Sequence, residues 1–469
     1  MNRRNFLWNL GLTSTSLAFA SGSFAKRVET FSETGSFSHL KSVGYGELIP
    51  TAAKNTGETY LALPKGFEYN VIGKIGTPMS DGNKTPPRHD GMATFQVGRE
   101  LRIIRNHEIV NGSKPLANSP IGANPYDEMA GGGTTTLVIN PKTKELIRDF
   151  VSLSGTLVNC AGGPTPWGSW ISCEETTLGK SIRTDSKGNQ TGGFNQPHGY
   201  CFEVFASANN PVSPVPLKAM GRFVHEAIAV DRKTGIVYLT EDDYSAGFYR
   251  FLPKRNKRLT EGGILQMLKI KGQDAFDTRK GQKMGMSWTA HWVTIDNPDP
   301  IEADFDPSAV YKEGLAKGAA TFARLEGIWA DKKGRMYFDA TNGGDAKAGQ
   351  IWLYEPINQN ESRLTLLFES PSRQILDMPD NICLHPKNDL LFICEDSDYA
   401  ELGEMPDNFM RILTKDGKIA DFAKNITEKK ESSEFAGSVF SKDGKTLFVN
   451  LQTIGATFAI WGDWQAFRR

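Results

Sequence analysis

Residues 327–340 have the sequence GIWADKKGRMYFDA, and this stretch contains the unit from which the fold can be predicted. An apolar stretch leads into a polar turn of Asp, Lys and Gly, and a second apolar stretch follows. This order is typical of a β-hairpin with a short loop. The same order returns in AIAVDRKTGIVYL at 227–239, NICLHPKNDLLFIC at 381–394 and GSVFSKDGKTLFVN at 437–450.

A third apolar stretch follows the hairpin in several units, at residues 247–252, 350–354 and 457–461. Looser copies lie upstream, around 91–140 and 163–205, and the units are separated by irregular insertions such as 254–322. Repeated antiparallel sheets of this kind predict an all-β fold, a single β-propeller. The count favours six blades over five or seven, and a β-sandwich with long insertions is the alternative architecture. The strand-like segment 66–72 is expected to close the ring by joining the last blade.

Composition restricts the class of protein. Lys and Arg together number 54, as do Asp and Glu, so no basic surplus indicates a nucleic acid or an anionic membrane as partner. The 47 glycines and 10% aromatic residues favour a protein rich in turns and strands. No apolar stretch of about eighteen residues follows the N-terminus, so we expect no membrane span in the mature protein.

Residues 1–25 have the features of an export signal. Arg3 and Arg4 are followed by Phe6 and Leu7, then by a mildly apolar stretch and a small-x-small ending at 23–25. The adjacent arginines predict a twin-arginine signal, with an ordinary secretory signal or a short uncleaved anchor as alternatives. We therefore expect a periplasmic or secreted protein of residues 26–469, handled by the twin-arginine export machinery.

Polar residues recur at two positions of the repeat. After the second strand come 106–108 (NHE), 173–175 (CEE), 241–243 (EDD), 341–342 (TN) and 395–397 (EDS). Before the first strand come 159–160 (NC), 225–226 (HE), 325–326 (LE), 380–381 (DN) and 434–435 (EF). In a propeller the first strand begins, and the second ends, on the same face near the axis. Both sets of residues are therefore expected to converge on one mouth.

Such a convergence of acids indicates bound metal. Crowded carboxylates raise one another's pKa values unless cations are present. Each acid alone could be a solvated turn residue or a strand-end cap, but the recurrence across units favours a metal site on the central axis. Oxygen ligands suit Ca²⁺, whereas a single thiolate indicates a transition metal such as iron or zinc. His107 and His225 directly precede acids and should point to the opposite face, in structural roles.

The chain has five cysteines, an odd number, so at least one thiol is unpaired or otherwise engaged if the compartment is oxidising. None of the spacings is C-x-x-C, which argues against a structural zinc site. The cysteines are Cys160, Cys173, Cys201, Cys383 and Cys394.

Several of these segments resemble the PhoX-type alkaline phosphatases. The longest is 159–175, with Asn-Cys-Ala-Gly-Gly followed by Trp-Gly-Ser-Trp-Ile-Ser-Cys-Glu-Glu; shorter matches are 105–108 (RNHE), 221–226 (GRFVHE) and 323–327 (ARLEG). The similarity extends from about residue 45 to the C-terminus, and a twin-arginine signal is also typical of that family. The resemblance implies a six-bladed propeller that holds two irons and three calciums around a bridging oxygen.

The resemblance also implies which residues form the site. Cys160 matches the iron-binding cysteine, and Arg324 matches an arginine that contacts phosphate and shares a strand face with Glu326. The acid within 241–243 is taken as Asp242 and that at 395–396 as Asp396, with the neighbouring acids left open. The implied metal ligands are Cys160, Glu174, Glu175, Glu226, Asp242, Glu326 and Asp396, and the implied catalytic residues are Arg324, Glu326 and Cys160.

The predicted function is hydrolysis of phosphate monoesters by an iron and calcium cluster, whose bound oxo or hydroxide would attack phosphorus in line. Arg324 would stabilise the charge on the phosphate oxygens, and Arg105 is a second candidate for that role. No serine lies in a G-x-S-x-G elbow. One alternative is a calcium-dependent propeller hydrolase of lactones or phosphotriesters, which needs no thiolate ligand. The other is a non-catalytic propeller that binds a partner. We expect a monomer that acts on a small phosphate ester.

Overall fold

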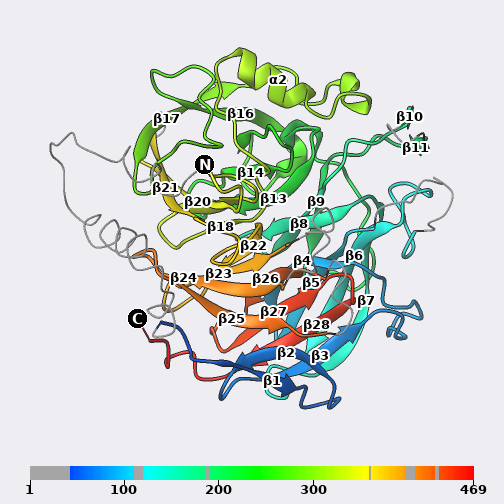
Figure 1. Cartoon of the computed structure of the whole chain (residues 1–469). Coiled ribbons are helices and arrows are strands. Elements are labelled where there is room, and N and C mark those ends of the chain that lie inside the picture. Colours follow the sequence, from blue (N-terminus) through cyan, green and yellow to red (C-terminus); the bar gives the residue numbers. More distant parts are fainter. Residues whose placement is uncertain are drawn as a thin grey trace, which may run out of the picture. The chain divides into compact units, whose positions relative to one another are not determined.

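The four hairpins predicted from the repeat are present in the computed structural model of the protein (Figure 1). In two of them the Asp that begins the turn organises it. The side chain of Asp231 accepts the Lys233 N–H at 3.0 Å, and that of Asp331 accepts the Lys333 N–H at 2.8 Å. The hairpins are β13 (His225–Val230) with β14 (Val237–Glu241), β18 (Ile328–Ala330) with β19 (Met336–Ala340), β22 (Pro379–Leu384) with β23 (Leu391–Glu395), and β26 (Phe435–Phe440) with β27 (Thr446–Leu451).

The structure describes residues 43–109, 120–184, 188, 190–358, 361–397, 407–427 and 433–468. All of them lie in the unit Leu40–Arg469. The predicted export signal at 1–25 lies outside the described residues. Within the described ranges, no helix is both long enough and apolar enough to cross a membrane.

Further strands extend each hairpin into a sheet. Two upstream groups match the looser repeats and stand alone: β4 (His89–Val97), β5 (Glu100–His107), β6 (Gly132–Ile139) and β7 (Leu146–Thr156) form one sheet, and β8 (Asn159–Pro164), β9 (Ser169–Glu174) and β12 (Cys201–Phe205) form another. Numbered in chain order, the fifth group begins with the hairpin β22–β23 and continues through β24 (Phe409–Leu413) and β25 (Ile419–Asn425). The sixth group begins with the hairpin β26–β27 and continues through β28 (Ala456–Trp461) and β3 (Glu68–Lys74). The N-terminal strands β1 (Leu48–Ala52) and β2 (Thr59–Pro64) extend the fifth group.

The segment 254–322 is more regular than its sequence indicates. It contributes β16 (Gly263–Ile270) and β17 (Ser287–Thr294), which pair with each other. β16 also pairs with β15 (Phe248–Pro253), and β17 pairs with β21 (Ser362–Glu369), which leads through β20 (Gln350–Pro356) to β19. The third group, which begins with β13, and the fourth group, which begins with β18, therefore form one nine-stranded sheet. Smaller elements are the hairpin β10 (Ile182–Thr184) and β11 (Gln190–Gly192), three 3-10 turns at Lys218–Met220, Leu259–Glu261 and Ile301–Asp304, and α2 (Ala309–Ala316).

The first strands of the six groups contact one another in a closed cycle. β4 contacts β8, and the contacts continue through β13, β18, β22 and β26 back to β4. Neighbouring strands approach so closely that some positions exclude a side chain. A Cβ on Gly91 would lie 2.5 Å from the Cα of Ala161, and one on Gly327 would collide with the carbonyl of Asp380. This cyclic packing of antiparallel sheets is an all-β, propeller-like fold.

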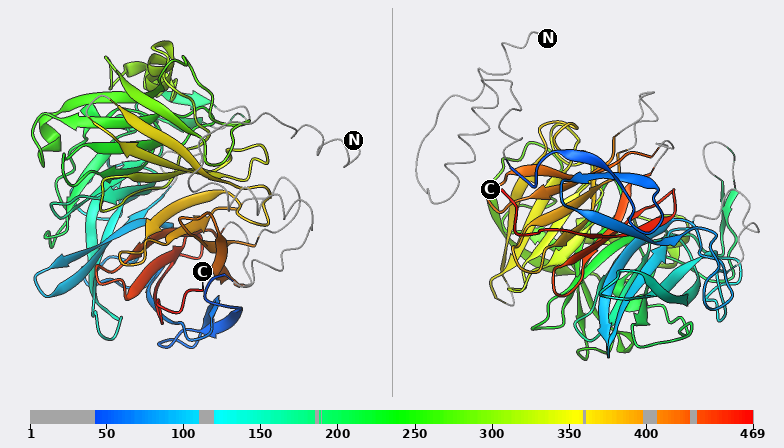
Figure 2. Two further views of the ribbon diagram at one scale, coloured as in Figure 1. Left: turned by 90° about the vertical axis from the view of Figure 1, so that its left-hand side faces the viewer. Right: turned by 90° about the horizontal axis from the view of Figure 1, so that it is seen from below.

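The early strand closes the last group, as predicted. β3 pairs antiparallel with β28, with Tyr69 opposite Ile460 and Asn70 opposite Ala459. Figures 1 and 2 show this contact as a blue strand beside the red C-terminal strands. Phe458 of β28 is fully buried, and its ring centroid lies 5.4 Å from that of Tyr60 and 5.5 Å from that of Tyr69. The N-terminal and C-terminal parts of the described chain thus share one core.

Phe458→Ala should lower the free energy of unfolding by about 3–5 kcal/mol, because it leaves a cavity where β28 meets β2 and β3. Denaturant titration followed by tryptophan fluorescence would measure the change. The matched control is Phe205→Ala in β12, where the side chain is 48% exposed and the expected change is within about 0.5 kcal/mol. Equal effects of the two substitutions would contradict the proposed closure.

Candidate metal centre

One backbone hydrogen bond recurs in all six groups at the end where the acids were predicted to meet. The residue after the second strand donates its N–H to the carbonyl of a residue just before the first strand. This bond brings the two recurrent sequence positions together within each group. The donor and acceptor pairs are Glu108 and Arg88, Glu175 and Val158, Asp242 and Val224, Thr341 and Arg324, Asp396 and Met378, and Gln452 and Glu434.

Backbone conformation then directs side chains inward. Four of the acceptor residues have left-handed backbones, with φ of 54° at Arg88, 48° at Val158, 43° at Arg324 and 45° at Met378. Left-handed conformations of such residues cost free energy and cluster at functional sites. Two positions further on lie Asp90, Cys160, Glu326 and Asp380. In three of these groups the strand pairing is irregular there, with register shifts that begin after His89, Asn159 and Pro379.

The side chains presented in this way line a cavity of about 280 Å³. Nine of the lining residues are acidic: Asp90, Glu108, Glu175, Glu226, Asp242, Glu326, Asp380, Asp396 and Glu434. The others are Cys160, Gln452, Arg88 and Arg324. The predicted convergence of the two sequence positions on one mouth is therefore present.

The crowded acids resist ionisation in the absence of cations. Burial, together with the nearby Glu326, raises the pKa of Glu226 well above its ordinary value. Burial and the carboxyl of Glu226 have the same effect on the pKa of Asp380. Burial, with a contribution from Asp396, raises the pKa of Glu108 to about 7. Nine carboxyl groups face only two guanidinium groups, so the cavity gains stability when it binds cations.

Two groups of side chains have the donors that metal ions require. The first is Cys160, Glu175 and Glu226, and the second is Glu226, Glu326 and Asp380; in each, three donor atoms lie within 4.8 Å of one another. The first group combines sulfur with oxygen, which suits a transition metal. The second has only carboxylate oxygens, which suits Ca²⁺. The residues present therefore fit the iron and calcium that the resemblance implies, and Glu226 belongs to both groups.

Arg324 is fixed beside these groups by two carboxylates. Its Nε and Nη2 donate to the two oxygens of Asp242 at 2.9 Å each, and Nη2 lies 2.8 Å from Oε1 of Glu326. The charge of Glu326, followed by that of Asp242, raises the pKa of Arg324 above its ordinary value, so the guanidinium stays charged. On another part of the lining, Arg88 donates to Gln452 at 2.6 Å, and Gln452 donates to Asp90 at 2.9 Å and to Glu108 at 2.8 Å.

Most of the predicted site residues lie together in this cavity, but Glu174 does not. The structure places Cys160, Glu175, Glu226, Asp242, Arg324, Glu326 and Asp396 in the lining. Glu174 instead accepts hydrogen bonds from the backbone N–H groups of Leu157, Gly199 and Tyr200 and contacts His198 at 2.6 Å. Adjacent residues of a strand point to opposite faces, so only one member of the Glu174–Glu175 pair can reach the cavity.

The same division occurs in two other acidic pairs. Glu241, next to Asp242, accepts hydrogen bonds from the Gly247 N–H and the Tyr249 hydroxyl, both at 2.7 Å. Glu395, next to Asp396, accepts from the N–H of Asp377 and from Arg411. These glutamates hold the turns behind the cavity, which explains why the sequence shows acids in pairs.

Arg105, the second candidate for phosphate contact, does not line the cavity. Its side chain is buried away from the lining and donates to Thr457 at 2.7 Å and to Thr135 at 3.2 Å. The arginine that joins Arg324 in the lining is Arg88. His107 and His225 also lie outside the lining, and both are buried.

Sequence reasoning did not assign several lining residues to the site. Glu108, Asp380 and Glu434 stand at the recurrent positions but were not included among the ligands implied by the resemblance. Asp90 was missed altogether because the first repeat is the least regular. The signal that could have found it is the order of residues 88–91 (RHDG), which matches 224–227 (VHEA) and 324–327 (RLEG).

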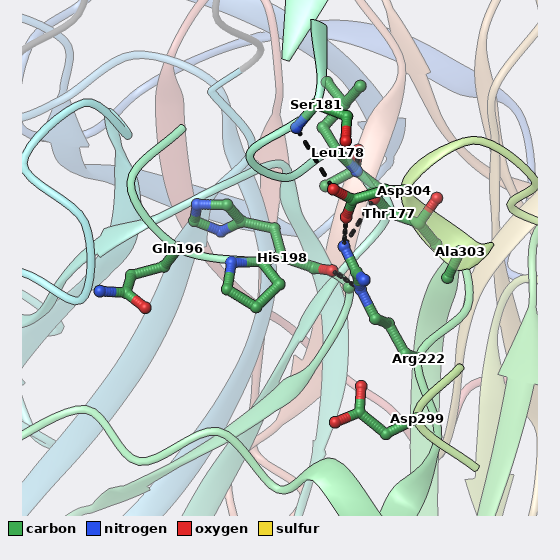
Figure 3. A network of polar contacts seen from close by, with 12 residues as sticks. Thr177, Leu178, Ser181, Gln196, His198, Arg222, Asp299, Ala303 and Asp304 are labelled. Carbon is green, nitrogen blue, oxygen red and sulfur yellow. Dashed lines mark hydrogen bonds and ion pairs between the residues drawn. The ribbon is translucent and has the colours of Figure 1, made fainter. Parts of the chain in front are cut away.

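A network of charged groups supports Glu174 from behind. His198 lies between Glu174, at 2.6 Å, and Asp127, at 3.7 Å, and all three side chains are fully buried. Figure 3 shows that Arg222 joins this network: its Nε donates to the His198 carbonyl at 2.8 Å, and its Nη2 forms an ion pair with Asp304. Although burial opposes it, the carboxylates of Glu174 and Asp127 raise the pKa of His198 to about 9.

The contribution of His198 to the stability of the protein should be lost as the pH rises through about 9. Its pKa is raised on folding from 6.5, so its stabilising contribution is complete below pH 6.5 and is lost as the pH passes the folded value. The loss should amount to about 3 kcal/mol. Urea unfolding of the wild type and His198→Gln at several pH values between 6 and 10 would measure it. The difference between the two profiles should shrink with rising pH, and parallel profiles would contradict the charged histidine.

Comparison with known proteins places this geometry in a family. A family model described as alkaline phosphatase PhoX matches residues 43–455. A search of curated protein sequences gave no match. Among solved structures, PhoX of Pseudomonas fluorescens in complex with vanadate, a transition-state analogue, has a TM-score of 0.65 at 19% sequence identity, over 90% of this chain and 98% of that chain. This similarity establishes the fold.

A second solved structure, a proposed gluconolactonase, has a TM-score of 0.37 at 10% identity, over 88% of this chain and 97% of that chain, and this score is too low to support a shared fold. The family model, by contrast, spans most of the sequence and all of the cavity-lining residues. The protein therefore belongs to the PhoX alkaline phosphatase family.

Proposed function

We propose that this protein is a metal-dependent phosphatase that hydrolyses phosphate monoesters. The observation that carries the proposal is the cavity, in which a thiol and nine carboxyl groups lie beside a fixed arginine in a chain of the PhoX family. A phosphate dianion would be repelled by these acids alone, so cations must reverse the charge of the cavity before substrate binds. We further propose that the six strand groups are the blades of a six-bladed propeller whose axis passes through the metal centre.

The two donor groups support different metals. We assign iron to Cys160, Glu175 and Glu226, because the thiolate favours a transition metal, and calcium to Glu226, Glu326 and Asp380. Asp242 and Asp396 lie in the same lining and are available to further calcium ions. When bound, such ions supply positive charge for phosphate oxygens and lower the pKa of water, which yields a nucleophile at neutral pH.

The role of Arg324 follows from its contacts. Asp242 holds the Nε and Nη2 edge of the guanidinium, and Glu326 holds Nη2 as well. Among the described residues, Nη1 of Arg324 has no hydrogen-bonding partner, so the Nη1 side of the guanidinium is available to a phosphate oxygen. A guanidinium fixed in this way needs little reorganisation when negative charge develops on the equatorial oxygens of the transition state.

Cys160 separates the proposed activity from the hydrolysis of lactones or phosphotriesters at a calcium site. Such a site needs carboxylates but no thiolate. The thiol of Cys160 is buried and donates to the carbonyl of His225 at 3.4 Å, and its sulfur lies within 4.8 Å of a carboxylate oxygen of Glu175 and of Glu226. A calcium site alone gives no reason for sulfur at this position.

We also propose that the protein works in the periplasm or outside the cell. The support is the arginine pair and apolar stretch of residues 1–25, which predict export by the twin-arginine route. That route carries folded proteins, so the metal centre could be assembled before export. Small phosphate esters in that compartment are then the expected substrates, and a monomer is the expected form.

Metal content and activity should be lost together. We expect the purified protein to contain iron and calcium by elemental analysis and to hydrolyse a chromogenic phosphate monoester. Chelation should abolish turnover, and Cys160→Ala should lose iron and reduce turnover at least about 100-fold. The matched control is Cys383→Ala, a buried cysteine outside the cavity, which should retain both metals and activity. Calcium without iron, and no turnover of the monoester, would refute the proposal and favour the lactone or triester hydrolases.

Arg324→Ala should lower kcat/KM by about 100- to 1,000-fold, because a charged contact to the transition state is lost. Arg324→Lys should recover only part of this loss, since an ammonium cannot keep the two-pronged contact with Asp242. Steady-state kinetics with a phosphate monoester would measure both effects, with metal content checked in each variant. Arg363→Ala, at a side chain that is 56% exposed, is the control and should behave like the wild type. Wild-type kinetics of Arg324→Ala would remove the arginine from the mechanism.

A further inference from the structure

Two cysteines outside the cavity face each other across neighbouring strands. Cys173 of β9 stands directly opposite Cys201 of β12 in the antiparallel register. Their sulfur atoms lie 3.6 Å apart, and both side chains are fully buried and reduced in this structure. Neither residue lines the cavity, so the proposed phosphatase site makes no use of them.

The backbone at this pair suits a disulfide bond. In the next pair along the two strands, the Glu174 N–H donates to the Tyr200 carbonyl at 3.1 Å. Hydrogen-bonded and non-hydrogen-bonded pairs alternate in antiparallel sheets, so Cys173 and Cys201 form a non-hydrogen-bonded pair, in which Cα atoms lie about 4.5 Å apart. Disulfides span Cα separations of about 4.4–6.8 Å. Side-chain rotation can therefore bring the sulfurs together without moving either strand.

The other cysteines lack this arrangement. Cys383 stands opposite Phe392, and Cys394 stands opposite Met410. Cys160 lies in the cavity lining, with Glu175 and Glu226 as its neighbours. Among the five cysteines of the chain, all of which the structure describes, only Cys173 and Cys201 are directly paired across two strands.

We propose that Cys173 and Cys201 are a disulfide-forming site that cross-links β9 to β12. The oxidant is a disulfide, either a small molecule such as oxidised glutathione or the disulfide of a thioredoxin-like oxidase. The thiolate of Cys201 attacks one sulfur of that disulfide, which releases one thiol and leaves a mixed disulfide. The thiolate of Cys173 then attacks the sulfur of Cys201 and releases the second thiol. Two protein thiols lose two electrons and two protons, and the oxidant gains them.

The fold provides a route to the buried pair. β12 is the edge strand of the three-stranded sheet β12-β9-β8, and its outer side carries the Phe202–Pro216 bridge and the hydrogen bond from the Leu217 N–H to the Cys201 carbonyl. Local separation of β12 from β9 would leave the other sheets paired. Cys201 would then meet the oxidant first, because it lies on that edge strand. Its thiol also lies 3.6 Å from Nδ1 of His225, whose Nε2 lies 3.0 Å from the Gly221 carbonyl. Nε2 thus donates to the carbonyl, which leaves Nδ1 facing the Cys201 thiol.

The cross-link would lie next to the hydrogen bonds that hold β9 and β12 together beside the cavity. β9 ends at Glu174, next to the lining residue Glu175, and the strand pair is held there by the Gly199 and Tyr200 N–H groups on the Glu174 carboxylate, at 2.8 and 3.1 Å. A disulfide one residue away would prevent β12 from separating from this end of β9. The inference concerns the thiols alone and does not depend on which ester the protein hydrolyses.

The test is a thiol count on the full-length protein under defined redox conditions. The protein is equilibrated in reduced and in oxidised glutathione buffers, then unfolded with chelator and alkylated, and its peptides are analysed by mass spectrometry. We expect five alkylated cysteines after reduction and three after oxidation, with one cross-linked peptide pair that contains Cys173 and Cys201. The oxidised form should also unfold at a higher denaturant concentration than the reduced form.

Variants make the assignment specific. Cys201→Ser should keep its remaining four thiols free in the oxidised buffer, whereas Cys383→Ser should still form the cross-link and leave two thiols. Because the wild type alone gives a decisive thiol count, the test does not depend on the folding of any variant. Five free thiols in the oxidised buffer, also after refolding in it, would overturn the proposal, as would a cross-link that involves Cys160, Cys383 or Cys394.

Discussion

The crowding of nine carboxyl groups in one cavity is the constraint on which the rest of the structure depends. Two charged groups within 4.8 Å of each other repel by at least roughly 3 kcal/mol at an effective dielectric constant of about 20. The chain accepts this repulsion because the ring of sheets fixes the backbone that carries each acid. The recurrent hydrogen bond before the first strand, together with the left-handed residue beside it in four of the groups, holds the backbone that presents these side chains. Only cations can relieve the repulsion without protonating the acids.

The repeat divides its acids between two tasks. In the Glu174–Glu175 pair, the first residue binds backbone N–H groups behind the cavity and the second faces the cavity. The supporting glutamates accept hydrogen bonds from backbone N–H groups, and Glu174 and Glu395 also face His198 and Arg411. In the cavity, nine acids face only two guanidinium groups, which leaves lone pairs of the carboxylate oxygens for metal ions. Stability and function thus use the same residue type on opposite faces of one strand.

The six groups are not equivalent, and this makes the cavity asymmetric. The fourth group has Thr341, and the sixth has Gln452, where the others place an acid after the second strand. Arg324 lies before the first strand of that fourth group, so the positive charge and the missing acid occur together. The guanidinium of Arg324 therefore lies on the side of the cavity where an acid is absent. This asymmetry is consistent with the proposed contact between Arg324 and phosphate.

The sequence by itself determined the elements that depend on local pattern. Alternation and turn residues gave the hairpins, and the recurrence of acids located the cavity at one end of the strands. The pattern of residues 66–72 also predicted a strand that closes the ring, and the observed strand, Glu68–Lys74, pairs with β28 of the last group. The resemblance added the identity of Cys160, Glu226 and Glu326 as residues that share one site.

Only the tertiary structure decided which acid of each pair enters the cavity. The two residues of a pair alternate in direction, but the sequence does not show which face of the strand lies toward the axis, because that depends on the packing of neighbouring sheets. For the same reason, the sequence did not show that Asp90 lines the cavity or that Glu174 and Arg105 lie outside it. Nor did it show that β17 joins the third and fourth groups into one sheet. Contacts between residues distant in sequence fix these features, and no local pattern encodes them.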